Sequence, residues 1–245
     1  MSRHLLVIGA QRCGTTYLHT MLDSHEQVTM ARPANPEPKV FCSDEKTRRG
    51  PEWYRETYFA HAGDELLLGE KSTSYLEDPD APARAKGMLG EIHVLAILRD
   101  PVQRAISNWR LSTDNGLETR DLETALSENL AGPRDWDPSR TSVSPFAYVE
   151  RGRYVDYLDP WMSTFPETSL VLFLEELLAD GRLPDDLWTA LGVAPDLAPR
   201  DQNYAVNQSP GASPVLSGEI LGTLGAYFEN SNQALSAYLG RELPW

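Results

Sequence analysis

The sequence predicts an α/β protein: one parallel β-sheet with helices on both of its faces. Its apolar segments are short continuous runs rather than alternating ones, which is typical of strands buried on both sides. A helical pattern follows several of these runs, and such strand–helix alternation favours a parallel sheet. With 245 residues, of which 41% are hydrophobic, the chain can bury one substantial core. We therefore expect a single domain over residues 1–245, with two smaller domains as the alternative.

Five apolar runs are the candidate strands. The first run ends at Gly9 and leads into a helical pattern over residues 15–25, in which Leu18 and Leu22 share one face. The longest run leads into a second helical pattern, PVQRAISNWRL. The closing residues 218–245 are expected to form two amphipathic helices that pack on the sheet. In chain order, the candidate strands are residues 4–9, 27–30, 65–71, 91–100 and 169–178.

Two segments between these elements are expected to be irregular. Residues 31–52 are rich in proline and charged residues, so we expect a loop there. Residues 111–150 contain one expected helix, over 120–132, and then a stretch without helical or strand periodicity. Because long loops without secondary structure of their own are uncommon in compact domains, we expect this second part to be a lid or a substrate-binding loop.

Composition and charge exclude several classes of function. The formal net charge of −14 argues against nucleic acid as a partner, because binding it requires a broad positive surface. No run of eighteen or more apolar residues is present, so no membrane-spanning helix is predicted. The start of the sequence does not have the pattern of a signal peptide, which favours the cytoplasm.

The cysteines and histidines do not predict a metal site. Cys13 and Cys42 are the only cysteines, too few for a disulfide framework and without a second ligand at metal-binding spacing. The five histidines are scattered along the chain. We therefore expect no metal, and the sequence leaves the oligomeric state open.

The stretch LLVIGAQRCGTTYLHTML contains the frame of a phosphate-binding loop. Gly9 and Gly14 have the spacing of G-x-x-x-x-G-K-[ST], between an expected strand and an expected helix. Thr15 stands where that pattern has lysine, and Arg12 supplies a basic residue inside the loop instead. Backbone N–H groups at the helix start, the hydroxyls of Thr15 and Thr16 and the guanidinium of Arg12 all suit an anion. The alternative is a tight turn that binds no ligand.

A second motif, LRDPVQRAISNW, lies at the end of the longest run. Arg99 ends the expected strand, Asp100 can cap the next helix, and Pro101 suits the first helical position. Ser107 lies about two turns into that helix. An arginine at a strand end beside a phosphate loop favours a second phosphate contact. The alternative is that Arg99 pairs with a carboxylate and Ser107 is a surface serine.

Two further segments carry charged residues that suit chemistry. In NPEPKVF, Glu37 lies between two prolines, which keep it out of a helix, and Lys39 follows two residues later. In GEKSTSYL, Lys71 follows an apolar run and is expected at a strand end. Ligands of parallel sheets bind at the carboxyl ends of the strands, so the glycine loop, Glu70-Lys71 and Arg99-Asp100 are candidates for one crevice. The alternatives are a solvated Glu–Lys pair and an exposed lysine.

Taken together and in order, these segments resemble the sulfotransferases that use 3′-phosphoadenosine 5′-phosphosulfate (PAPS). The likeness is to the branch that contains the heparan sulfate sulfotransferases and their bacterial small-molecule relatives. VIGAQRCGTTYL is similar to the 5′-phosphosulfate loop, EPKVF to the glutamate-bearing loop, and EKSTSY to the segment E-K-[ST]-P-x-Y. LRDPVQRAISNW is similar to the 3′-phosphate motif, and RGRYVDYLDPW and LGRELPW also resemble family segments. The resemblance covers nearly the whole chain and implies the sulfotransferase fold.

The resemblance implies a set of residues that bind PAPS. The glycine loop would hold the 5′ end, and the strand-end motif would hold the 3′-phosphate. A late loop, within NYAVNQSPG, would cover the nucleotide. The implied residues are Arg12, Cys13, Gly14, Thr15, Thr16 and Tyr17 at the 5′ end, Arg99 and Ser107 at the 3′ end, and Asn207 and Ser209 in the late loop.

The resemblance also implies in-line attack of an acceptor hydroxyl, or an amine, on the sulfur of PAPS, with the desulfated nucleotide PAP as product. Glu37 would be the general base. Arg12, at the position of a family lysine, would stabilise the leaving phosphate, and Lys71 would lie near the transferred group. Lys39 stands where the heparan branch has histidine, and Tyr75 would contact the acceptor. A sulfuryl group carries less negative charge than a phosphoryl group, so protein cations can replace a metal.

The acidic net charge favours a small-molecule acceptor, such as a natural-product scaffold, a lipid or a sugar, over a long polyanion. Residues 111–150 are then expected to shape the choice of acceptor. Three alternatives stay open. A kinase-like enzyme would need the loop lysine that Thr15 replaces, and a binding or scaffold protein would keep the fold without turnover. An aryl sulfate could also replace PAPS as donor.

Overall fold

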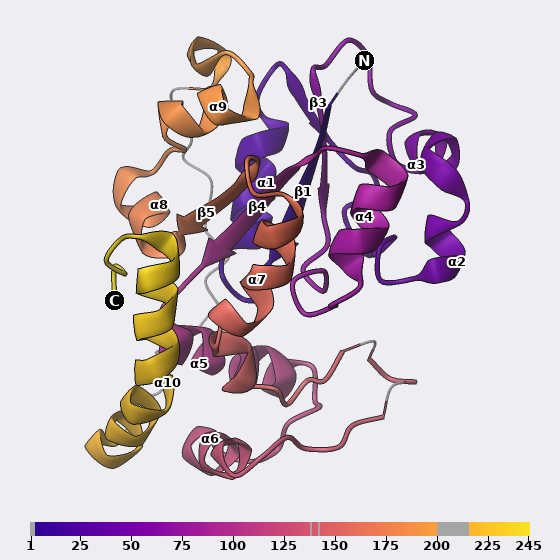
Figure 1. Cartoon of the computed structure of the whole chain (residues 1–245). Helices are drawn as coiled ribbons and strands as arrows, with labels where there is room; N and C mark the ends of the chain where they lie inside the picture. The colour runs from indigo at the N-terminus through magenta and orange to yellow at the C-terminus, as the bar shows by residue number, and fades with distance from the viewer. Residues whose placement is uncertain (1–2, 138, 142, 200–215) are drawn as a thin grey trace. The chain divides into compact units, whose positions relative to one another are not determined.

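The computed structural model describes residues 3–137, 139–141, 143–199 and 216–245 (Figure 1). The described residues form two compact units. The first comprises residues 3–98 and 157–199, and the second comprises residues 99–156 and 216–245. The expectation of a single domain over residues 1–245 stays a prediction.

The first unit is built on a parallel sheet, as the sequence predicted. Its five strands lie in the order β2-β3-β1-β4-β5, and every neighbouring pair is parallel. All six residues of β4 are buried, and so are the last five of β1, which explains their continuous apolar runs. The strands are β1 (Arg3–Gly9), β2 (Val28–Met30), β3 (Leu67–Lys71), β4 (His93–Leu98) and β5 (Ser169–Phe173).

Helices flank this sheet, and Figure 1 shows α4 and α7 in front of it and α1 behind it. The short helix α2 and the helix α3 follow β2 in the chain, and α8 and α9 follow β5. The helix α7 begins in the second unit and continues into the first. The bounds are α1 (Thr15–Asp23), α2 (Asp44–Thr47), α3 (Gly50–Tyr58), α4 (Ala81–Leu89), α7 (Val155–Thr164), α8 (Leu174–Asp180), α9 (Asp185–Leu191) and the 3-10 turn η2 (Pro195–Leu197).

Two expectations for the first unit were wrong in part. The expected strand 169–178 ends at Phe173, and its second half is the helix α8, whose first turn carries Glu175 and Glu176. Acidic residues in a first turn favour a helix because they complement the positive charge at its N-terminus. The apolar run 169–178 therefore changes from strand to helix at Leu174. The expected loop 31–52 contains α2 and the start of α3, because the Ser43 hydroxyl caps α2 through Lys46 N.

The second unit is helical and has its own hydrophobic core. It contains α5 (Pro101–Asp114), α6 (Leu122–Leu130), the 3-10 turn η1 (Glu150–Gly152) and α10 (Gly218–Leu239). As predicted, Asp100 caps α5: its carboxylate accepts hydrogen bonds from Val102 N and Gln103 N. The core comprises Ala105, Ile106, Leu122, Ala125, Leu126, Phe146, Tyr148, Val149, Leu216, Ile220, Leu224 and Phe228.

The closing segment differs from the expectation of two helices. Residues 218–239 form one helix, α10, whose buried residues recur every three or four positions from Ile220 to Leu235. Such spacing keeps one continuous apolar stripe on one face. Because the stripe is unbroken and no proline interrupts the segment, a single helix buries it.

A buried carboxylate anchors the segment 111–150 within the second unit. The Glu118 side chain is fully buried and accepts hydrogen bonds from Arg120, from Tyr148 Oη at 2.8 Å and from Thr119 N at 2.9 Å. Burial alone would raise the pKa of Glu118, but these hydrogen bonds lower it to about 2. This part of the chain is therefore held by a charged group that stays ionised in mild acid.

We predict that Glu118→Gln destabilises the protein at pH 7 by on the order of 3 kcal/mol, because it leaves the Arg120 guanidinium without its buried partner. The difference from wild type should shrink as the pH falls from about 4.5 toward 2, where the unfolded chain binds a proton before the folded one. Urea unfolding at pH 7, 5 and 3 measures this change.

Glu128→Gln is the matched control, since Glu128 is an exposed partner of the same arginine. That change should cost less than about 1 kcal/mol. A Glu118→Gln effect that stayed constant from pH 7 to pH 3 would contradict the ionised, buried role of Glu118.

Candidate functional site

The glycine loop connects β1 to α1 at the carboxyl edge of the sheet. Gly14 is the N-cap of α1, with φ of 83°, and it has no side chain that could cap the helix. The first turn of α1, all of which is described, carries no acidic residue. The helix N-terminus therefore keeps its partial positive charge and its N–H donors for an anion.

Leu174 explains the second glycine of the loop by close packing. A Cβ atom at Gly14 would lie 2.6 Å from Leu174 Cδ1, so the end of the Leu174 side chain would have to shift. The positive φ is a second reason, because residues with a Cβ are strained there. The glycine at position 14 thus reflects both turn geometry and contact with α8.

The loop side chains expected to bind the 5′ end of a nucleotide divide into two groups. Cys13, Thr15 and Tyr17 are buried in the first unit, so their side chains belong mainly to its packing. Thr16 is exposed and Arg12 is half-buried. Arg12 also has a φ of 69°, in the left-handed region. Among the described residues, the only other non-glycine residue with a positive φ is Lys39, in the second candidate segment.

Glu37 is held at the end of β3 by two residues of the segment EKSTSY. Lys71 Nζ donates to Glu37 Oε1 at 2.7 Å, and Thr73 N donates to Glu37 Oε2 at 3.0 Å. The Thr73 hydroxyl adds a third donor, 3.0 Å from Oε2 and 3.2 Å from Oε1. The Glu37 and Lys71 side chains are only 17% and 10% exposed. A carboxylate has about four lone-pair positions, so one remains for a ligand.

The opposite face of the same segment holds a second carboxylate. Glu70 is fully buried and accepts hydrogen bonds from Tyr54 Oη at 2.6 Å, Ser72 Oγ at 2.6 Å and Tyr75 Oη at 2.7 Å. Burial raises the pKa of Glu70, and the three hydroxyl donors oppose that rise. Burial and the neighbouring Glu70 raise the pKa of Tyr54 and Tyr75 well above the usual tyrosine value.

The hydroxyls that bind Glu70 also hold the backbone that follows Glu37. Lys39 N donates to Ser72 Oγ at 2.9 Å, and Val40 N donates to Tyr75 Oη at 2.8 Å. A longer hydrogen bond of 3.3 Å joins Phe41 N to the same tyrosine oxygen. Residues 37–41 and 70–75 are thus joined along their length, and we call this pairing the strand-end clasp.

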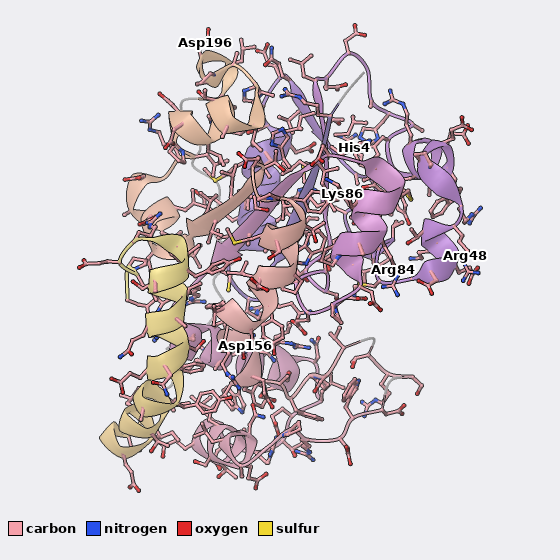
Figure 2. The ribbon with its side chains drawn as sticks, viewed as in Figure 1. His4, Arg48, Arg84, Lys86, Asp156 and Asp196 are labelled. Carbon is pink, nitrogen blue, oxygen red and sulfur yellow. The ribbon has the colours of Figure 1, made fainter. Side chains whose placement is uncertain are left out.

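Carbonyl groups of the clasp are held from the helical side. Lys46 Nζ donates to Pro38 O at 2.7 Å and Thr47 Oγ1 donates to Val40 O at 3.2 Å. Arg84, labelled on α4 in Figure 2, donates to Phe41 O at 3.2 Å and forms ion pairs with three aspartates. The backbone of residues 38–41 is therefore fixed on both sides.

Tyr75 does not fit its expected contact with an acceptor. Its side chain is completely buried, and its hydroxyl is used by Glu70 and by the amides of the clasp. Strand alternation alone would place Tyr75 on the side of Lys71 and Thr73. The tyrosine reaches the buried side because the chain turns after β3, where Tyr75 N donates to Ser72 O at 3.1 Å. Its role in this structure is to hold residues 40 and 41.

Sequence reasoning placed Glu70 at a strand end without a role, and it did not single out Ser72 or Thr73. The signal that could have found them is the run of polar residues from Glu70 to Ser74, which lies at the strand end where ligands of parallel sheets bind. It also missed His19 on α1, which is half-buried. Burial lowers the pKa of His19, Asp23 opposes this, and the charges of Lys71 and Arg32 lower it further.

The expected 3′-phosphate residues belong to the second unit. Arg99 follows β4 directly in the chain and is half-buried, and its carbonyl accepts a hydrogen bond from Tyr154 Oη at 2.7 Å. Ser107 is half-buried on α5. The contacts within the first unit therefore describe the surroundings of the glycine loop, Glu37 and Lys71, and not those of Arg99 and Ser107. The expected contacts of Asn207 and Ser209 lie outside the described residues.

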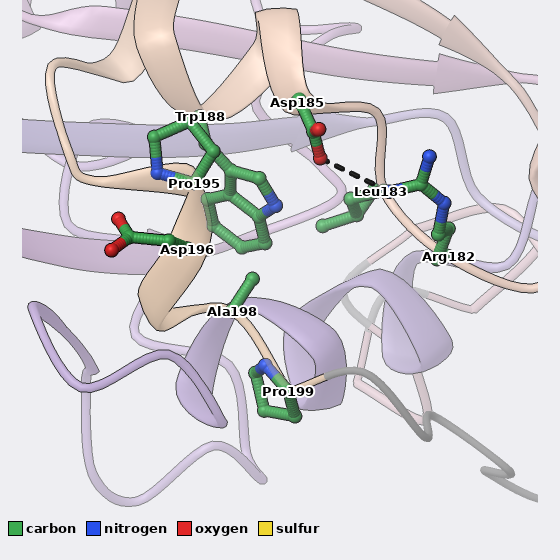
Figure 3. A pocket seen from close by; sticks show the side chains of 8 residues that line it. All are labelled: Arg182, Leu183, Asp185, Trp188, Pro195, Asp196, Ala198 and Pro199. Carbon is green, nitrogen blue, oxygen red and sulfur yellow. Dashed lines mark hydrogen bonds and ion pairs between the residues drawn. The ribbon is translucent and has the colours of Figure 1, made fainter.

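A separate pocket of about 590 Å³ lies between α9 and the turn that follows it (Figure 3). Trp188 forms part of its wall and packs on His25, with ring centroids 4.6 Å apart. His25 follows the C-terminal end of α1, whereas the glycine loop precedes its N-terminal end. This pocket is therefore distinct from the clasp. It is lined by Arg182, Leu183, Asp185, Trp188, Pro195, Asp196, Ala198 and Pro199.

Across the described part of the chain, no group of three or more His, Cys, Asp or Glu side chains gathers as metal ligands do. None of the described helices is both long and apolar enough to span a bilayer.

Comparison with known proteins gives one family. The family model described as "Sulfotransferase domain" matches residues 2–182. The bifunctional heparan sulfate N-deacetylase/N-sulfotransferase 1 of Caenorhabditis briggsae is 30% identical over 169 residues, which cover 66% of this chain and 19% of that protein. The heparan sulfate glucosamine 3-O-sulfotransferase 3B1 of Mus musculus is 26% identical over 267 residues, which cover 98% of this chain and 64% of that protein. The chain thus spans less than two thirds of the length of these relatives.

Solved structures are similar in fold. A sulfotransferase from Alicyclobacillus acidocaldarius matches with a TM-score of 0.79 and 23% identity, covering 99% of this chain and 98% of that one. The sulfotransferase domain from the curacin biosynthetic pathway matches with a TM-score of 0.56 and 14% identity, covering 100% and 99% of the two chains. The parallel sheet with its glycine loop is thus the sulfotransferase fold. Since the family model matches well over half of its residues, this chain belongs to the sulfotransferase domain family.

Proposed function

We propose that the protein transfers a sulfuryl group from PAPS to a hydroxyl, ahead of an amine, of a small-molecule, lipid or sugar acceptor. The observation that carries this proposal is the fixed carboxylate of Glu37, held by Lys71 and Thr73 at the end of β3. The neighbouring strand β1 leads directly into a loop suited to an anion. Family membership supports sulfuryl transfer as the reaction class.

The glycine loop suits the 5′ end of PAPS. Its helix N-terminus lacks an acidic residue in the first turn, all of which is described, and Gly14 allows close approach of the backbone. Arg12, whose guanidinium stays protonated, would hold the 5′-phosphate, which remains on PAP after the transfer. PAPS supplies the sulfuryl group and leaves as PAP. Arg99 and Ser107 are proposed to hold the 3′-phosphate, and no metal is proposed because Arg12 and Lys71 supply positive charge.

Glu37 is proposed to be the general base. Three donors orient its carboxylate, and its remaining lone-pair position can accept the proton of an acceptor hydroxyl. Lys71 would have two roles. It holds the Glu37 carboxylate, and its positive charge would lie near the transferred sulfuryl group. Lys39, two residues after the base, is proposed to lie beside the acceptor.

The acceptor is proposed to be small rather than polymeric. The names of the matched relatives refer to heparan sulfate, an anionic polymer, but this chain has a net charge of −14. An acidic surface repels a long polyanion, whereas a small molecule meets only the local charges of the site. The segment 111–150 is proposed to shape acceptor choice, and the cytoplasm is the proposed location.

We predict that PAP raises the midpoint of thermal unfolding by several degrees and that ATP with magnesium does not. A ligand at about a hundredfold its dissociation constant stabilises the folded state by roughly 2.7 kcal/mol. For a chain of this size, each kcal/mol raises the midpoint by about 2–4 °C. Arg99→Ala should abolish the PAP shift, whereas Arg153→Ala, at an exposed arginine of the same unit, should retain it.

Other outcomes of this thermal-shift measurement would favour one of the alternative functions. A shift with ATP and magnesium alone would contradict the proposal and favour the kinase-like alternative. No shift with either nucleotide would contradict PAPS as donor and favour an aryl sulfate donor or a binding protein. A PAP shift without any release of PAP from PAPS would favour a binding protein.

We predict that Glu37→Gln lowers the rate of sulfuryl transfer by 10²- to 10⁴-fold, roughly the contribution of a general base, and leaves the PAP shift unchanged. The rate is the release of PAP from PAPS with a panel of phenol, sterol and amino-sugar acceptors. Glu45→Gln, at an exposed glutamate on α2, is the control and should retain the rate. Retention of the wild-type rate in Glu37→Gln would exclude the glutamate as base.

A further inference from the structure

We propose that Glu70 is a positioning residue: its carboxylate orients the hydroxyls of Ser72 and Tyr75, and these hold the backbone segment that carries Glu37. The role in catalysis rests on the function proposed above. The hold on the backbone does not, because it is visible in the hydrogen bonds of the strand-end clasp.

Glu70 is an unusual core residue because its donors are neutral. Within the described chain, three hydroxyls donate to it, from Tyr54, Ser72 and Tyr75, and its side chain has no exposed surface. Burying a carboxylate among neutral groups is costly, and the nearby charge of Glu37 adds to that cost. A core selected for stability alone would favour an apolar side chain here.

The carboxylate fixes the direction of each hydroxyl. A hydroxyl has one proton to donate, whereas an ionised carboxylate can only accept. Ser72 and Tyr75 give that proton to Glu70, so their remaining lone pairs are available to Lys39 N and Val40 N. The oxygen of Tyr75 also accepts a longer bond from Phe41 N. Three consecutive amides are therefore held by acceptors that Glu70 orients.

The held segment determines where Glu37 lies. Only Pro38, with its restricted φ, separates Glu37 from the first held amide, that of Lys39. On the outer side of the same strand end, Lys71 and Thr73 bind the Glu37 carboxylate itself. The inner residues therefore fix the backbone and the outer residues fix the side chain.

Glu70 acts through other residues and not on a substrate. Its side chain and that of Tyr75 are completely buried, so no acceptor reaches them in this structure. Tyr54 provides a matched control for Tyr75. It donates to the same carboxylate at 2.6 Å, but the hydroxyls that hold residues 39–41 are those of Ser72 and Tyr75.

The test compares Glu70→Leu, Glu70→Gln and Tyr75→Phe with Tyr54→Phe as matched control. Leucine fills the space of Glu70 without an acceptor, and glutamine retains one acceptor oxygen. The readouts are amide hydrogen exchange of residues 39–41, the rate of PAP release from PAPS at saturation, the KM for PAPS and the PAP thermal shift.

Exchange should accelerate at least tenfold for residues 39–41 in Glu70→Leu and for residues 40 and 41 in Tyr75→Phe. Both variants should lower the saturated rate at least tenfold. The KM for PAPS and the PAP shift should stay at wild-type values, because the glycine loop is unchanged. Glu70→Gln should recover part of both losses, since its carbonyl oxygen can still accept from Ser72 and Tyr75. Tyr54→Phe should retain the exchange and the rate of wild type. Tyr75→Phe keeps the test decisive if Glu70→Leu does not fold.

The outcomes separate this inference from the proposed function. A wild-type protein that transfers no sulfuryl group contradicts the proposed function, while faster exchange in Tyr75→Phe and Glu70→Leu still supports the hold on residues 39–41. Wild-type exchange in both variants overturns the hold. An active wild type whose variants exchange faster but retain the full rate overturns the positioning role. A rate loss of equal size in Tyr54→Phe would also overturn it, because any weakening of the core would then suffice.

Discussion

The hydrogen bonds between residues 37–41 and the segment EKSTSY are the interaction on which the candidate site depends. Lys71 and Thr73 bind the Glu37 carboxylate, and Ser72 and Tyr75 accept hydrogen bonds from the backbone of residues 39–41. Ser72 lies opposite Lys71 because successive side chains alternate at the strand end. Tyr75 reaches the same side as Ser72 through the turn after β3, in which its N–H donates to Ser72 O at 3.1 Å. The pairing of β3 with both β1 and β2 fixes where this segment begins.

The clasp also explains how the proline-rich segment NPEPKVF becomes a rigid support for Glu37. The N–H groups of residues 39–41 donate to Ser72 and Tyr75. The carbonyl groups of Pro38, Val40 and Phe41 accept from Lys46, Thr47 and Arg84. A site built on such a segment does not depend on regular secondary structure for its precision. The glycine loop reaches the same edge of the sheet by a different route, through a turn that leaves a helix N-terminus open to an anion.

Much of the fold could be predicted from the sequence, because continuous apolar runs and the Asp100-Pro101 helix start are local signals. The contact between Glu37 and Lys71 could not be predicted from spacing, since they lie 34 positions apart and the chain between them forms α2 and α3. Tyr75 was misjudged for a related reason: its sequence motif does not tell which side of the strand end it faces. The closing helix α10 was misjudged because two short amphipathic patterns and one long one look alike until their shared stripe is buried.

The most direct test of this account is a crystal structure of the protein with PAP bound. The account predicts the 5′-phosphate at the backbone N–H groups of Gly14, Thr15 and Thr16, the 3′-phosphate at Arg99 and Ser107, and Glu37 still bonded to Lys71 and Thr73. PAP bound elsewhere, or a Glu37 carboxylate that has left Lys71 and turned to solvent, would contradict the claim that the strand-end clasp holds the catalytic base beside the donor site, where it can deprotonate the acceptor.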